Sequence, residues 1–279
     1  SFLSVIIVKK QKKGDKGMKK EQLISVALIF ILNDDLLHIF RKKAGIPTSA
    51  KGLAGWCGSG ASTFGQKLAA FTKLYCVTGD ERLKEKAITL ADGWAECVAK
   101  NPDELLKNGT YIYDKLIGRL IDMYQYLGYT KTEKYISMLT DWAIANFKRD
   151  IKRDGLQDAE LSGADMIEWY TLPENLYKAY QLFGDEKYRE FAKEWDYDYL
   201  WDKLNNRDFN IGPRHAYSHV NSLSSAAKAY EVTGDERYLS AMEIAYEEIT
   251  TNHIYATGGY GPAECLFGDH PGYLGDALK

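Results

Sequence analysis

Four short segments combine acids, amides, aromatic rings and histidines in a way that suits recognition of a polyhydroxylated molecule. Aromatic side chains pack against the apolar faces of a sugar ring, while fixed polar groups satisfy its hydroxyls. We therefore expect a small glycoside or oligosaccharide as partner. The predicted substrate-binding residues are Trp56 and Gln66 in the first segment, Tyr113, Asp114 and Lys115 in the second, Trp169, Tyr170 and Glu174 in the third, and His215 and His219 in the fourth.

Some of these residues also have a structural interpretation. Pro173 and Glu174 are typical of an ordinary helix start, with the acid near the positive end of the helix dipole. His215 and His219 lie four residues apart, so on a helix they would share a face and could bind a metal. The H-E-x-x-H pattern is absent and the spacing suggests no third ligand, which favours a hydrogen-bonding pair. No metal site is predicted.

A glycine-rich stretch at residues 256–264 ends in a carboxylate, Glu264. It does not match a dinucleotide-binding fingerprint, because no strand is predicted before it. Glycine permits close approach of the backbone to a ligand, with Glu264 carried at the end of the loop. Glu264 is therefore the candidate catalytic residue, and a solvated surface carboxylate is the alternative.

Repeated helical hairpins must position these residues. The turns that begin at Gly79, Gly184 and Gly234 each continue with Asp-Glu, and Gly128 marks a degenerate copy. Successive glycines are 49, 56 and 50 residues apart, and a Tyr precedes each by four residues. Glycine can end the first helix in a left-handed conformation, and the Asp-Glu pair then favours the start of the second helix. Part of the Tyr excess, 20 residues in all, would then be structural.

The hydrophobic periodicity predicts an all-α fold of hairpins about fifty residues long. Short turns alternate with long polar connections, which favours an α/α toroid with its functional face on the long loops. An open α-solenoid is the alternative. We place this toroid over residues 21–279. The predicted helices span about 63–78, 80–99, 111–127, 131–148, 173–183, 185–200, 217–233 and 235–252, with a short helix near 34–43.

The charge distribution argues against a nucleic-acid partner. The net charge of the 279 residues is −3, but residues 1–20 hold seven lysines and one acid. The remaining residues carry 29 basic against 38 acidic side chains, without the basic face that phosphate binding needs. We interpret residues 1–20 as a lysine-rich, disordered leader. The segment from Met18 to Leu32 resembles a weak signal sequence, its apolar run is too short for a membrane span, and the compartment stays open between cytoplasmic and exported.

The chain resembles glycoside hydrolase family 127, which includes β-L-arabinofuranosidases. The resemblance covers about residue 33 to the C-terminus, and three stretches carry it. They are Ala44–Pro47 with Leu53–Trp56 and Gly65-Gln66, then Tyr111–Lys115 running to Asp141-Trp142, and finally His215 through Ala256–Gly261 to Glu264.

The resemblance implies an (α/α)6 barrel, or toroid, that hydrolyses a terminal sugar with retention of configuration. The four predicted hairpins fall short of six, so we expect the toroid of this chain to be incomplete. The resemblance also implies that Glu264 is the general acid/base and that His215 touches the sugar. Relatives place histidines where this chain has Lys115 and Trp169, which suggests a different sugar. Their nucleophile is a zinc-bound cysteine downstream of the glycine loop, so no cofactor is expected in this chain, and zinc only if such a Cys/Glu segment follows. Cys265 is interpreted as structural.

Two other functions remain open on this scaffold. A sugar lyase or epimerase would use a similar ring of helices, since one fold hosts several chemistries. A non-catalytic helical-repeat protein would instead bind a partner along an open surface. Asp114, Glu174, His215 and Glu264 would then lie far apart.

Overall fold

The computed structural model describes residues 38–47, 61–105, 109–149, 168–211, 214–261 and 265–266, which fall into two compact units divided between Asn101 and Pro102. The predicted leader, residues 1–20, lies outside the described residues. Unit 1 contains α3 (His38–Lys43), α4 (Ala61–Thr78) and α5 (Glu81–Lys100). Helix α5 packs against both of the others. The rings of Phe40 and Phe64 meet edge to face at 4.9 Å in the core of this unit.

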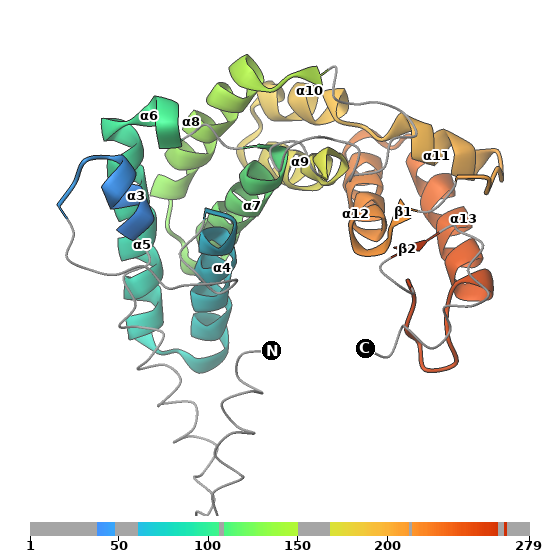
Figure 1. The fold of residues 1–279 in the computed structure, drawn as a ribbon, viewed down its shortest axis with the longest axis horizontal. Coiled ribbons are helices and arrows are strands. Elements are labelled where there is room, and N and C mark those ends of the chain that lie inside the picture. The colour runs from blue at the N-terminus through green and yellow to red at the C-terminus, as the bar shows by residue number, and fades with distance from the viewer. Residues whose placement is uncertain are drawn as a thin grey trace, which may run out of the picture. The chain divides into compact units, whose positions relative to one another are not determined.

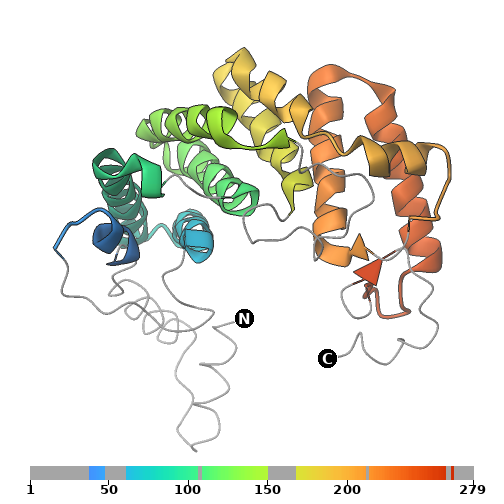
Figure 2. The ribbon, with the colours of Figure 1, turned by 45° about the horizontal axis from the view of Figure 1, so that its top comes forward.

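Unit 2 holds three helical hairpins, α7/α8, α9/α10 and α12/α13 (Figure 1). The first helices, α7, α9 and α12, pack side by side, and each is covered by its own partner (Figure 2). The elements are α6 (Pro102–Leu105), α7 (Thr110–Leu127), α8 (Lys131–Asn146), the 3-10 helix η3 (Trp169–Thr171), α9 (Leu172–Phe183), α10 (Glu186–Glu194), α11 (Asp198–Asn205), β1 (Arg214–His215), α12 (Ala216–Thr233), α13 (Glu236–Asn252) and β2 (Cys265–Leu266).

The hairpin turns have the structure that their repeated sequence predicts. Gly184 ends α9 at φ 70°, and the Asp185 side chain accepts a hydrogen bond of 3.0 Å from the backbone N–H of Lys187. The Tyr180 hydroxyl donates to the Glu186 carboxylate at 3.2 Å, which ties the two helices together across the turn. The same bond recurs in the turns at Gly79 and Gly234, from Tyr75 to Glu81 at 3.1 Å and from Tyr230 to Glu236 at 3.5 Å, whereas the degenerate turn at Gly128 has no glutamate at this position. These repeated tyrosines are therefore structural.

The predicted helix over residues 185–200 is wrong in one respect, because the chain forms two helices there, α10 and α11. Trp195, Asp196 and Tyr197 separate them, and all three side chains are buried. Residues two apart point to different sides of a helix, so Trp195 and Tyr197 could not both enter the core from a continuous one. The Tyr238 hydroxyl donates to the Asp196 carboxylate at 2.6 Å, which fixes the break against α13.

The glycine loop after α13 forms a tight turn. Ile254 pairs with Tyr260 in an antiparallel bridge, and the Tyr255 N–H donates to the Gly259 carbonyl at 2.8 Å. Gly258 has φ 87°, and a Cβ atom added to it would meet nothing within 4 Å. Glycine is therefore favoured at this position by the left-handed backbone. Among the described residues, no helix combines the length and apolarity needed to cross a membrane.

Candidate functional site

The first helices of unit 2 bring a polar cluster together where the long connections enter them. This helix-start cluster draws on the beginnings of α7, η3 with α9, and β1 with α12. Hydrogen bonds, ring contacts and charge interactions link its members from one helix to the next. Its residues are Tyr111, Asp114, Lys115, Glu168, Asn175, His215 and Tyr217.

Asp114 joins α7 to α9. Its Oδ1 accepts a hydrogen bond of 2.8 Å from the Asn175 amide, and its Oδ2 lies 3.2 Å from the Lys115 ammonium. Gly118 makes this contact possible, because a Cβ atom at that position would lie 2.8 Å from the Asn175 side-chain atoms. A glycine on α7, one turn after Asp114, therefore lets the Asn175 amide reach the carboxylate.

Lys115 is the cation of the cluster. Its side chain is 14% exposed, and its ammonium lies 4.9 Å from the centre of the Tyr111 ring. Burial alone would lower the pKa of Lys115, but the carboxylates of Asp114 and Glu168 outweigh this effect and raise it above its usual value. The ammonium therefore stays charged and can donate to an oxygen-rich ligand.

Glu168 connects η3 to α12. The residue is buried, and its backbone has φ 57°, a left-handed conformation that is unfavourable for a residue other than glycine. Its carboxylate accepts a hydrogen bond from the Tyr217 hydroxyl. Partial burial and the Glu168 carboxylate raise the pKa of Tyr217 above its usual value, so this hydroxyl keeps its proton. Strained backbone held at a polar cluster is a feature of functional sites.

His215 occupies the end of the cluster at β1. Its Nδ1 lies 3.0 Å from the Ser218 hydroxyl, and its ring meets the Tyr217 ring edge to face at 4.7 Å. His215 also pairs with Cys265 in the antiparallel β1–β2 ladder. The short sheet therefore joins the start of α12 to the segment that follows the glycine loop.

His219 lies beneath the cluster as a buried hydrogen-bonding residue. Its Nδ1 lies 2.8 Å from the His215 carbonyl, which can only accept, so this nitrogen carries the proton. Its Nε2 then accepts from the Tyr197 hydroxyl at 3.3 Å. Burial lowers the pKa of His219 to about 3, which keeps the ring neutral. Both ring nitrogens serve hydrogen bonds, as expected for the hydrogen-bonding interpretation of the His215 and His219 pair.

A family model described as "Beta-L-arabinofuranosidase, GH127 catalytic domain" matches residues 15–271. The chain belongs to this family. Comparison with the curated proteins finds no match.

Solved structures share the fold of this GH127 chain. A GH127 β-arabinofuranosidase is 18% identical, with a TM-score of 0.52 over 82% of this chain and 40% of its own. A GH127 β-L-arabinofuranosidase from Geobacillus stearothermophilus T6 is 16% identical, with a TM-score of 0.56 over 81% of this chain and 41% of its own. A cellobiose 2-epimerase from Bacillus thermoamylovorans is 15% identical, with a TM-score of 0.53 over 72% of this chain and 62% of its own.

These likenesses confirm the predicted all-α fold of the (α/α)6 toroid class. The chain spans less than two thirds of the length of each of the three structures. At these identities the likeness concerns the fold alone.

The GH127 domain places several of the predicted substrate-binding residues in its core. Tyr113 is 1% exposed, and its hydroxyl lies 2.9 Å from that of Thr140. Trp169 and Tyr170 are each 2% exposed and pack against the Tyr197 ring. These three side chains and His219 are buried in the core next to the helix starts. Tyr111, only partly buried, is the tyrosine that the cluster uses at the start of α7.

The remaining predicted residues lie elsewhere. The Glu174 carboxylate pairs with Lys178 one turn further along α9, and its backbone N–H donates to Ser225 at 3.2 Å. These contacts agree with the helix-start interpretation of Pro173 and Glu174. Gln66 is exposed on α4 of unit 1. Trp56 and Glu264 lie outside the described residues.

The sequence reasoning passed over four members of the cluster that lie in the segments it examined: Tyr111, Glu168, Asn175 and Tyr217. No periodicity separates these residues from their polar neighbours, and the bonds that distinguish them cross between helices. One signal was available. Gly118 interrupts an otherwise strongly helical pattern, and an isolated helical glycine often marks a close packing contact.

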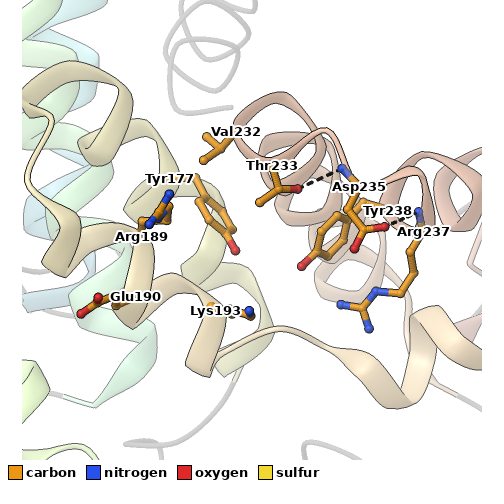
Figure 3. A pocket seen from close by; sticks show the side chains of 9 residues that line it. All are labelled: Tyr177, Arg189, Glu190, Lys193, Val232, Thr233, Asp235, Arg237 and Tyr238. Carbon is orange, nitrogen blue, oxygen red and sulfur yellow. Dashed lines mark hydrogen bonds between the residues drawn. The ribbon is translucent and has the colours of Figure 1, made fainter.

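A cavity of about 690 Å³ lies in a different part of unit 2, between the α9/α10 and α12/α13 hairpins (Figure 3). Arg189 and Lys193 of α10 lie along one side, and Asp235 and Arg237 lie along the other. Arg237 is already paired with Asp198 at 2.8 Å. None of the predicted site residues lines this cavity, and its charges are of both signs. The helix-start cluster is therefore the better candidate site.

Proposed function

We propose that this protein is a glycoside hydrolase that releases a terminal sugar, of the β-L-arabinofuranoside class, with Glu264 as general acid/base. The match of residues 15–271 to the GH127 catalytic domain is the observation that carries this proposal. Membership of the family supports a glycoside hydrolase-like function. The sugar and the role of Glu264 are the further steps proposed.

The chemistry of the helix-start cluster supports a sugar as ligand. A charged ammonium on Lys115, the Asp114 carboxylate and the His215 ring offer donors and acceptors within one small region. The ring of Tyr217, which is 43% exposed, offers a face for the apolar side of a sugar. Such a mixture of fixed polar groups and aromatic faces suits a neutral polyol better than an apolar ligand.

Chain connectivity supports the choice of Glu264 as proton donor. Glu264 immediately precedes Cys265, and Cys265 pairs with His215 of the cluster. A general acid has to be protonated before the glycosidic bond breaks and then has to deprotonate the attacking water. Burial or a neighbouring negative charge would favour the protonated form.

Zinc, which the family resemblance implies beside a nucleophilic cysteine, does not fit the residues that the structure describes. Within them, no group of three or more His, Cys, Asp or Glu side chains could hold a metal ion. The two ring nitrogens of His219 are used by the His215 carbonyl and the Tyr197 hydroxyl. No step of the proposal passes through zinc.

Hydrolysis of aryl glycosides by Glu264→Gln and the parent tests the proposal. We expect kcat/KM to fall by about 10²-fold or more on substrates with a poor leaving group, because these depend on protonation by the acid. For a substrate with an acidic phenol as leaving group, the rate of the first step, in which the glycosidic bond breaks, should fall less in Glu264→Gln. Glu243→Gln, an exposed change on α13, is the matched control. Equal rates for Glu264→Gln and the parent would contradict the assignment.

A sugar epimerase is the second candidate, favoured by the fold likeness to cellobiose 2-epimerase. Product analysis separates the two reactions. Hydrolysis releases a free sugar and an aglycone, whereas epimerisation converts a disaccharide into its isomer without breaking the glycosidic bond. Isomerisation of cellobiose without release of monosaccharide would replace the proposed hydrolase by an epimerase.

A further inference from the structure

We propose that Glu168 and Tyr217 form a positioning pair that fixes the orientation of His215 toward the sugar. The inference rests on the proposed function, because it assigns His215 to sugar contact. It adds two residues, from two different elements, whose interaction controls that contact.

Glu168 is suited to act as the fixed member of the pair. It is 4% exposed, and its left-handed backbone at φ 57° leaves it little freedom to adopt other conformations. Its carboxylate also contributes to the field that keeps Lys115 charged. Glu168 thus anchors the pair through its backbone, its burial and the neighbouring ammonium.

Tyr217 connects Glu168 to His215. Its hydroxyl donates to the Glu168 carboxylate, while its ring meets the His215 ring at 4.7 Å with an interplanar angle of 77°. On the other side, the Ser218 hydroxyl lies 3.0 Å from His215 Nδ1. The imidazole is therefore held by a hydrogen bond and by a ring whose tilt depends on Glu168.

The two residues differ in whether they could contact the sugar directly or only position His215. Tyr217 has exposed surface and could touch a sugar itself, whereas buried Glu168 could act only through its neighbours. If the residues act as a pair, removal of either should have the same effect, and removal of both should cost little more. Independent contacts with the sugar would give effects that add.

Kinetics of Tyr217→Phe, Glu168→Ala and the double variant test this coupling. We expect each single change to lower kcat/KM by about tenfold, because a displaced imidazole contacts the sugar less well, and the double variant to lie close to the singles. Glu168→Gln keeps an acceptor oxygen for the Tyr217 hydroxyl and should recover part of the loss. Tyr230→Phe on the same helix removes a similar Tyr–Glu bond at a hairpin turn and is the control. Additive effects, or a Tyr217→Phe rate equal to that of the parent, would overturn the pair.

Nuclear magnetic resonance of the imidazole nitrogens gives a readout that does not depend on turnover. The signals of His215, assigned with His215→Asn, should shift in Tyr217→Phe and in Glu168→Ala but not in Tyr230→Phe. If the parent hydrolyses glycosides but the His215 signal is unchanged in both variants, the pair is refuted and the proposed function stands. A parent without hydrolysis refutes the proposed function, and the His215 signal then decides whether the pair exists.

Discussion

The two ends of the hairpins in unit 2 are stabilised by interactions of different range. At the turn of α9/α10, residues from Tyr180 to Lys187 supply the glycine, the cap and the tyrosine bond, and each partner lies within six residues. At the helix starts, Asp114 bonds with Asn175, 61 positions away, and Glu168 bonds with Tyr217, 49 positions away. The turns can therefore repeat in sequence, while the helix starts depend on how neighbouring hairpins pack.

The two ends also differ in their contribution, which is stability at the turns and function at the helix starts. A turn built from local contacts gives the same structure wherever the Gly-Asp-Glu sequence recurs, so it presents no special chemistry. The helix starts place charged and aromatic groups in a strained, partly buried arrangement that makes no repeat. Conflict with local preference at such a place is typical of sites that serve function.

Gly118→Ala is expected to have the largest effect, because it breaks a contact between two hairpins. The new methyl group would lie 2.8 Å from the Asn175 side chain and force its amide away from Asp114. Loss of a hydrogen bond to a charged group, together with crowding, should cost about 2–3 kcal/mol in the free energy of unfolding. Urea unfolding measures the cost, and kcat/KM should fall with it.

The double change Gly118→Ala with Asn175→Ala serves as the control for this prediction. Removal of the Asn175 amide relieves the crowding, so the double variant should unfold at a higher urea concentration than the sum of the single changes predicts. Strict additivity would show that Gly118 does not serve the Asp114 contact.

The structure of the hairpin turns could be predicted from the sequence, whereas the contacts at the helix starts could not. Gly184 and Asp185 could be assigned their roles as C′ residue and N-cap because the physical causes, left-handed φ and an unsatisfied N–H, are local. Glu168 could not be singled out, since its importance comes from Tyr217 and Lys115 on other helices. Tyr113 was assigned to the sugar because it lies at a polar helix start, whereas its hydroxyl meets that of Thr140 in the core.

The free energy of unfolding should decrease in acid because His219 is buried on the core side of the helix starts. An unfolded histidine binds its proton near pH 6.5, whereas burial lowers the pKa of His219 to about 3 in the folded protein. The unfolded state therefore binds more protons between these values, and stability falls as the pH drops from about 6.5 toward 3. Between pH 7 and pH 5 the loss from this group should be about 2 kcal/mol.

Urea midpoints at pH 7 and pH 5 for the parent, His219→Gln and His253→Gln measure this loss. His219→Gln should remove most of the acid sensitivity, while His253→Gln, at the end of α13 beside Glu248, should retain it. The same drop in all three proteins would mean that another group carries the acid response.

Gly184→Ala is expected to have the smallest effect, because Gly184 contributes only its backbone conformation to the turn. A Cβ atom at Gly184 meets nothing within 4 Å, so the cost comes only from the left-handed φ of 70°, about 1 kcal/mol in the free energy of unfolding. Gly184→Asn should cost less, since asparagine tolerates this conformation better than alanine. Activity should not change in either variant, because the local contacts of the turn do not extend to the helix starts. A loss of kcat/KM in Gly184→Ala at temperatures where the variant is folded would show that the two ends are coupled.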